Sequence, residues 1–172
     1  MMRKFLVAFS LLLTGCVGLP ENVKPVAHFN ADKYLGKWYE IARLDHSFER
    51  DLTKVSATYS LREDGGIRVI NRGYDAQKQQ WKEADGKAYF VNSADQGYLK
   101  VSFFGPFYGA YIVVELDQEN YQYSLVSGPD KLYLWILSRA PQMNQETQMR
   151  LVEKAAALGF DTGKLIFVEQ DK

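Results

Sequence analysis

Cys16 is the only cysteine of the 172-residue chain, and it directly follows a short apolar segment. Arg3 and Lys4 give that segment a positive start, residues 5–13 are mostly apolar, and the small residue Gly15 precedes the thiol. This layout is typical of a secretory signal peptide. The apolar run is too short for a transmembrane helix, which needs roughly 20 residues. A thiol at this position is a nucleophile that can accept a lipid group.

The tetrapeptide Leu13-Thr14-Gly15-Cys16 resembles the lipobox of bacterial lipoproteins. The resemblance implies that a signal peptide, residues 1–15, is removed and that acylated Cys16 becomes the first residue of the mature protein. Acyl chains, at about 0.8 kcal/mol per buried methylene, would then anchor the protein firmly in a membrane. In such lipoproteins an Asp after the cysteine favours the inner membrane, so Val17 favours the outer membrane. A plain signal peptide cleaved nearby, or a buried cysteine of no special role, are the alternatives.

Other residue types that could support chemistry are sparse. His28 and His46 are the only histidines, and they do not lie in a cluster of His, Cys, Asp and Glu with the spacing of metal ligands. The glycines of residues 105–109 lack the lysine and the helix of a phosphate-binding loop. No motif places a serine beside a histidine. The sequence therefore predicts a protein without a metal, without a cofactor and without enzymatic activity.

Composition favours one globular domain without affinity for nucleic acid. Basic and acidic residues number 21 each and cancel, and they form no basic block. Residues 16–28 contain Pro20 and Pro25 and show no apolar period, which predicts a lipidated tether. The folded domain is expected over residues 29–172, a length that suits a single core. A homodimer is compatible with this sequence.

Short apolar runs separated by turn signals predict an all-β domain. The alternation over residues 54–61, followed by Glu63-Asp64-Gly65-Gly66 and residues 67–74, predicts a β-hairpin. Eight strands are expected in all, at residues 38–44, 54–61, 67–74, 81–90, 98–103, 108–116, 121–127 and 132–138. Such strands can close into an antiparallel up-and-down β-barrel. Leu151, Val152, Ala155 and Leu158 share one face of a C-terminal α-helix, which should pack outside the barrel, and residues 165–168 predict a last short strand.

Alternation also predicts which side chains line the barrel. Glu115 is expected to point outward, which would direct its neighbours at even positions inward. Applied to each strand, this reasoning predicts a lining of Val55, Ala57, Tyr59, Val69, Asn71, Ala88, Phe90, Leu99, Val101, Phe103, Ile112, Val114 and Leu116. The same pattern would also arise in a barrel whose core is completely filled.

Three motifs together resemble the signature of lipocalins. Gly36-Lys37-Trp38 opens the first strand, residues 128–133 lie before the last barrel strand, and Arg139 ends that strand. The resemblance implies an eight-stranded barrel in which Trp38 plugs the closed end and Arg139 packs across it, with Gly36 completing the signature. Residues 36–43, 45–50, 101–108 and 134–139, downstream of the lipobox, resemble the bacterial outer-membrane lipocalins, which are related to apolipoprotein D.

This closer resemblance implies binding, storage or transport of fatty acids or lysophospholipids for envelope maintenance. Some relatives carry a cysteine where this chain has Ser127, so a barrel disulfide is excluded here. Residues 45–50 are expected to form a lid with His46 and Phe48. Lys54, Lys87, Lys100, Arg43, Arg62 and Arg72 are candidates for a cation at the mouth, although they would equally suit a solvated strand face. An interaction protein with a filled barrel and a lipid-modifying enzyme are the alternative functions.

Overall fold

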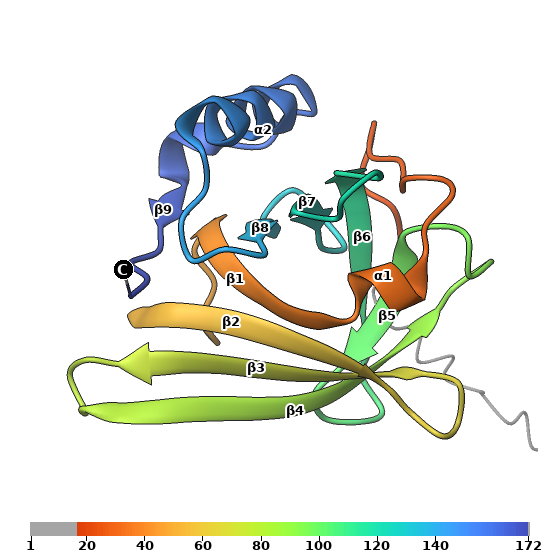
Figure 1. Cartoon of the computed structure of the whole chain (residues 1–172), viewed down its shortest axis with the longest axis horizontal. Coiled ribbons are helices and arrows are strands. Elements are labelled where there is room, and N and C mark those ends of the chain that lie inside the picture. Colours follow the sequence, from red (N-terminus) through yellow and green to blue (C-terminus); the bar gives the residue numbers. More distant parts are fainter. Residues whose placement is uncertain (1–16, 172) are drawn as a thin grey trace, which may run out of the picture.

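The computed structural model describes residues 17–171, and one antiparallel sheet dominates it (Figure 1). Its strands are β1 (Gly36–Arg43), β2 (Leu52–Leu61), β3 (Ile67–Asp75), β4 (Gln80–Phe90), β5 (Tyr98–Ser102), β6 (Gly109–Leu116), β7 (Tyr123–Ser127), β8 (Leu134–Ser138) and β9 (Ile166–Phe167). Neighbours follow chain order from β2 to β8, and β1 pairs with both β8 and β2. The sheet therefore closes, which confirms the predicted eight-stranded up-and-down barrel. The short β9 pairs with β1 beside it.

The β2–β3 hairpin forms where the sequence predicts it. Leu61 pairs with Ile67, and the connecting turn contains Gly65 at φ +80°, a left-handed conformation that glycine adopts at little cost. The Asp64 carboxylate accepts a hydrogen bond from the Gly66 amide at 3.0 Å, which holds the turn. Local turn chemistry and strand alternation agree at this point, so the register is well determined.

Apolar side chains pack in two layers, one inside the barrel and one between the barrel and the C-terminal helix. Helix α2 (Gln145–Ala157) begins at Asn144, whose side chain accepts hydrogen bonds from the Glu146 and Thr147 amides. Its face carries Leu151 and Ala155 into the outer layer, against side chains from β1, β6, β7 and β8. Figure 1 shows the helix lying across one side of the barrel, as predicted.

The segment before the first strand differs from the predicted tether, because it packs against the barrel well before residue 29. Val23 is 3% exposed and belongs to the outer layer. The Val26 amide donates to the Val113 carbonyl, and the Val26 carbonyl accepts from the Gly97 amide. Helix α1 (Ala31–Tyr34) follows, capped by Asn30, and its Lys33 and Tyr34 carbonyls accept hydrogen bonds from Arg139 and Trp38 at one end of the barrel. The backbone hydrogen bonds of Val26 to Val113 and Gly97 explain the difference, because the prolines of this segment gave no sign of them in the sequence.

The described part of the chain contains no helix long and apolar enough to cross a bilayer. The predicted signal peptide and Cys16 lie outside the described residues. The remaining short helix, η1 (Thr162–Lys164), links α2 to β9. The C-terminal residues then run along the barrel, where the Gln170 side chain donates to the carbonyls of Glu40 and Val55 and so joins β1 to β2.

Candidate ligand-binding site

The closed end of the barrel is sealed by Trp38 and Arg139. Trp38 is fully buried, and the guanidinium carbon of Arg139 lies 4.0 Å from the centre of its ring. Arg139 also donates to the carbonyls of Lys33, Lys37 and Tyr121. Gly36, at φ +93°, brings the backbone close to this guanidinium, since a Cβ there would lie 3.3 Å from Arg139 Nη1. These positions are those that the lipocalin resemblance implies.

The inner layer contains most of the residues that alternation assigns to the lining. Tyr59, Val69, Ala88, Leu99 and Leu116 are buried in it, and Ala57, Phe90, Val101 and Phe103 pack against it while remaining partly exposed. Asn71 pairs with Ala57 across the β2–β3 ladder and so shares its face. Val55 lies close to Gly73 on the same wall, where a Cβ on the glycine would be 3.2 Å from the valine methyl group. Side chains that face inward yet keep some exposure are the ones a ligand would contact.

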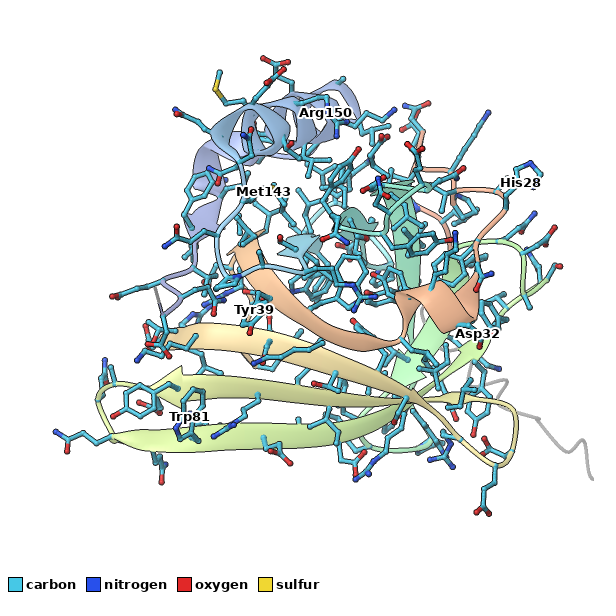
Figure 2. The ribbon with its side chains drawn as sticks, viewed as in Figure 1. His28, Asp32, Tyr39, Trp81, Met143 and Arg150 are labelled. Carbon is cyan, nitrogen blue, oxygen red and sulfur yellow. The ribbon has the colours of Figure 1, made fainter. Side chains whose placement is uncertain are left out.

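The prediction for Ile112 and Val114 is wrong, because both side chains belong to the outer layer beneath α2. Val113 and Tyr111 face the interior instead. Glu115 does point outward, and its carboxylate lies 3.4 Å from Arg150 on α2, the helix that Figure 2 shows with Arg150 labelled. A β-bulge between Val113 and Glu115 shifts the register, so counting back from Glu115 by alternation reverses the faces.

Four hydroxyl groups form a chain of hydrogen bonds in the inner layer. Tyr111 Oη lies 2.8 Å from both Tyr34 Oη and Tyr59 Oη, and Tyr34 Oη lies 3.2 Å from Ser124 Oγ. Burial raises the pKa of Tyr34 to about 12 and raises the pKa of Tyr59 and Tyr111 well above the usual value. The hydroxyls therefore stay neutral and satisfy one another, which makes a polar but uncharged patch in an otherwise apolar wall.

A buried ionisable cluster lies toward the other end of the barrel. Glu40 shares the Trp38 face of β1, and its carboxyl accepts a hydrogen bond from Arg43 Nη1 at 2.7 Å. Arg43 Nη2 donates to the Glu49 carbonyl at 2.8 Å, and Trp135 Nε1 donates to the Glu49 carboxyl at 3.1 Å. Burial raises the pKa of Glu40 well above its usual value, and the nearby Glu49 raises it further, against the lowering effect of Arg43. Burial also raises the pKa of Glu49.

Residues 44–51, which connect β1 to β2, fold over this cluster with His46 and Phe48 at their centre. The two rings stack with centroids 4.1 Å apart, and the imidazole also contacts Tyr133 and Trp135. His46 is only 6% exposed, whereas Phe48 is 57% exposed. Burial lowers the pKa of His46 to about 4, and Arg43 lowers it further. His46 Nε2 lies 3.3 Å from a Glu49 oxygen, and neither ring nitrogen makes a hydrogen bond to the described residues.

Of the six cations considered for the mouth, the structure places Arg43 inside the barrel, where its guanidinium is hydrogen-bonded to Glu40. Arg62 pairs with Asp64, Lys54 pairs with Asp171, and Arg72 lies over the Trp81 ring. Lys100 lies over the Tyr108 ring, and Lys87 is a half-buried residue of β4. These contacts belong to the outer surface rather than to the inner wall. Among the described residues, no three His, Cys, Asp or Glu side chains gather as a metal site.

Sequence reasoning missed Glu40, Glu49, Tyr34, Tyr111 and Trp135. A signal for Glu40 was available, because it is two residues from Trp38 and must share its face in a regular strand. Glu49 had no such signal, since only the folded path of residues 44–51 brings it inward. Two open grooves, of about 510 and 710 Å³, lie beside β9 and the C-terminal segment. Their lining includes outer residues such as Ile166, Phe167 and Met143, and the smaller groove also reaches Arg43.

Comparisons with known proteins agree with this architecture. The family model described as a lipocalin-like domain matches residues 29–170. "Outer membrane lipoprotein Blc" of Vibrio cholerae is 60% identical over 96% of this chain and 97% of its own length. The protein of the same name from Escherichia coli K12 is 54% identical over 95% of this chain and 92% of its own. These relatives confirm the predicted resemblance and the localisation at the outer membrane.

A solved structure of lower identity supports the fold alone. Insecticyanin from the tobacco hornworm Manduca sexta superposes with a TM-score of 0.72 at 21% identity, and the match covers 90% of this chain and 88% of that chain. The sealed barrel, the matched residues and the relatives together lead to one conclusion. The chain belongs to the lipocalin family.

Proposed function

We propose that the protein carries a single-chain amphiphile, a fatty acid or a lysophospholipid, in its barrel at the outer membrane. The observation that supports this proposal is the inner wall, where Ala57, Phe90, Val101 and Phe103 face inward from β2, β4, β5 and the residue after β5 and remain partly exposed. Acylation of Cys16 would attach the carrier to the membrane. Storage or transport of such lipids would serve maintenance of the envelope.

The size of the barrel favours one acyl chain over two. Eight strands enclose an interior just wide enough for side chains and one slender ligand. A chain of about 16 to 18 carbons gains roughly 0.8 kcal/mol for each buried methylene before ordering costs, which suffices for micromolar binding. A second acyl chain would have to displace the inner side chains or remain in water. Diacyl phospholipids should therefore bind more weakly.

The ionisable cluster supports a position of the head group at the mouth of the barrel. Arg43 is bound to Glu40 and to backbone carbonyls, so it is not free to pair with a ligand anion deep in the barrel. The base is sealed by Trp38 and Arg139, whose guanidinium donates to backbone carbonyls. An acyl chain pointing toward the base would leave its head group at the mouth, beside residues 44–51. The proposed role is binding alone, without catalysis at this site.

Mass spectrometry of co-purifying lipids tests the proposal, using a chain that begins at residue 16 and carries Cys16→Ser, so that neither the signal peptide nor the anchor contributes lipid. We expect a stoichiometric mono-acyl lipid, released on denaturation. Tryptophan fluorescence should be quenched saturably by oleate and by lysophospholipid. An empty protein that also fails to bind either lipid would overturn the proposal and favour an interaction protein with a filled barrel. Turnover of the added lipid would favour the enzyme.

A further inference from the structure

The two ends of the barrel differ sharply in the chemistry of their loops. Residues 44–51, 76–79, 103–108 and 128–133 connect successive strands at the open end, opposite the end that Trp38 seals. Three of these loops expose large apolar side chains: Phe104 at 78%, Leu132 at 71%, Phe107 at 61% and Phe48 at 57%. We call these four side chains the rim. Large exposed apolar side chains that gather at one end of a molecule favour a surface that a partner or a membrane covers.

The closed end offers a contrast within the same molecule. Its loops, residues 62–66, 91–97 and 117–122, carry Glu63, Asp64, Asp95 and Glu119. Figure 2 shows Asp32 near this end, while Trp81 lies far from it at the tip of the β3–β4 hairpin. Leu61, 60% exposed at the end of β2, is the large apolar side chain that the described surface presents here. The most exposed of the large apolar side chains thus gather in loops of the open end, where charged residues such as Asp45, Arg50 and Asp130 accompany them.

The start of the described chain places the predicted anchor close to the barrel. Pro20 and Val23 are already buried, so only residues 17–19 separate Cys16 from the packed segment, a span of about 10 Å when extended. The carbonyl of Val17 accepts a hydrogen bond from the Tyr98 hydroxyl. An acyl group on Cys16 would therefore hold the barrel itself close to the bilayer.

We propose that the rim inserts into the surface of a phospholipid bilayer, so that the mouth of the barrel opens directly onto lipid. This inference rests on the proposed lipid carriage, and it names the partner from which the lipid is taken or to which it is delivered. Aromatic and leucine side chains on separate loops around an opening suit the interface between head groups and acyl chains. Lipid could then pass between bilayer and barrel without crossing water.

The test compares two variants of the mature chain that begins at residue 16 and carries Cys16→Ser, which removes the anchor. One variant replaces Phe104, Phe107 and Leu132 by Ser, and the matched control is Leu61→Ser at the closed end. Partition onto phosphatidylethanolamine–phosphatidylglycerol vesicles is measured by co-sedimentation. We expect the rim variant to lose at least about tenfold in partition, from the transfer energy of three large apolar side chains, and the control to lose none.

Oleate binding from solution separates this inference from the proposed carriage. The rim variant should bind free oleate like the parent chain but should take up lipid from vesicles more slowly. Unchanged vesicle partition in the rim variant, or an equal loss in Leu61→Ser, would overturn the inference. Loss of self-association with unchanged partition would also overturn it, by assigning the rim to a contact between copies. If the parent chain itself does not bind oleate, that result would instead count against the proposed lipid carriage.

Discussion

Arg43 donates to the carboxyl of Glu40 at 2.7 Å inside the barrel, where the two side chains are 2% and 4% exposed. Burying a guanidinium and a carboxyl away from water costs free energy, so this contact requires its further hydrogen bonds. Arg43 finds them at the carbonyls of Glu49 and Leu52. Arg43 Nε has no partner among the described residues. Loss of either side chain, Arg43 or Glu40, should therefore lower the stability of the protein.

Substitution of Glu40 tests this account. Glu40→Ala leaves Arg43 buried without its carboxyl partner and should destabilise the protein by about 3 to 5 kcal/mol. Glu40→Gln keeps an oxygen for Arg43 and should cost much less. Because the folded protein holds the Glu40 proton above the usual pKa of 4.5, this carboxyl contributes less stability as the pH rises through its folded pKa. In urea unfolding, the free energy of unfolding of the Gln variant relative to that of the parent should therefore increase from pH 5 to pH 8. A trend in the opposite direction would contradict the assignment.

His46 should act on stability with the opposite sign. Its folded pKa of about 4 lies below the usual 6.5, so between these values the unfolded chain binds a proton that the folded protein does not. The stability contributed by neutral His46 is complete above pH 6.5 and is lost as the pH falls toward 4. His46→Phe keeps a ring for the stack with Phe48 and should flatten this part of the profile. Since Glu40 and Glu49 are present in both proteins, the difference between the two profiles isolates His46. Parallel profiles would refute the prediction.

The contact between Trp38 and Arg139 can be measured by a double-mutant cycle. Trp38→Ala should cost about 3 to 5 kcal/mol as a large-to-small change in a packed core. Arg139→Ala should cost less, because part of its contribution is hydrogen bonding to the exposed side of the seal. The two losses should be non-additive, since the guanidinium lies 4.0 Å from the ring. Additive losses in chemical denaturation would mean that the contact has no energetic weight.

The barrel was predictable because local signals agreed with one another. The β2–β3 hairpin combined strict alternation with a glycine turn, and α2 combined an apolar stripe with a cap at Asn144. The seal at Trp38 followed from the family signature. Lining residues on β6 were not predictable by the same means, because a bulge at Val113 and Glu115 interrupts the alternation on which the assignment depended.

The ionisable cluster was not predictable for a different reason. Charged residues in a strand are normally placed outward, since burial of a lone charge is unfavourable. Glu40 faces inward only because Arg43 and Glu49 meet it there, and Glu49 reaches it from a connecting segment whose path no strand period describes. A similar limit applies to Tyr111, whose hydroxyl finds Tyr34 and Tyr59 from two distant parts of the chain.

Lipid attachment at Cys16 remains a prediction, because this residue lies outside the described part of the chain. Cys16→Ser should abolish incorporation of radioactive palmitate, since a hydroxyl is a poor substitute for the thiol nucleophile. The precursor should also fail to mature normally. Expression of the parent chain under the same labelling conditions is the control. Undiminished labelling of the Ser variant would remove the lipoprotein assignment while leaving the barrel untouched.

Filling the interior provides the sharpest test of the ligand site, and the corrected faces of β6 supply its control. Val101 packs against the inner layer and is partly exposed, so Val101→Trp should occupy space that an acyl chain needs. Val114 lies in the outer layer, so Val114→Trp should lower stability by about 1 to 3 kcal/mol through overpacking and leave the interior open. Fluorescence titration with oleate, at a temperature where both variants are folded, should show weakened binding only for Val101→Trp. Full binding by that variant, or equal weakening by both, would exclude the interior as the lipid site.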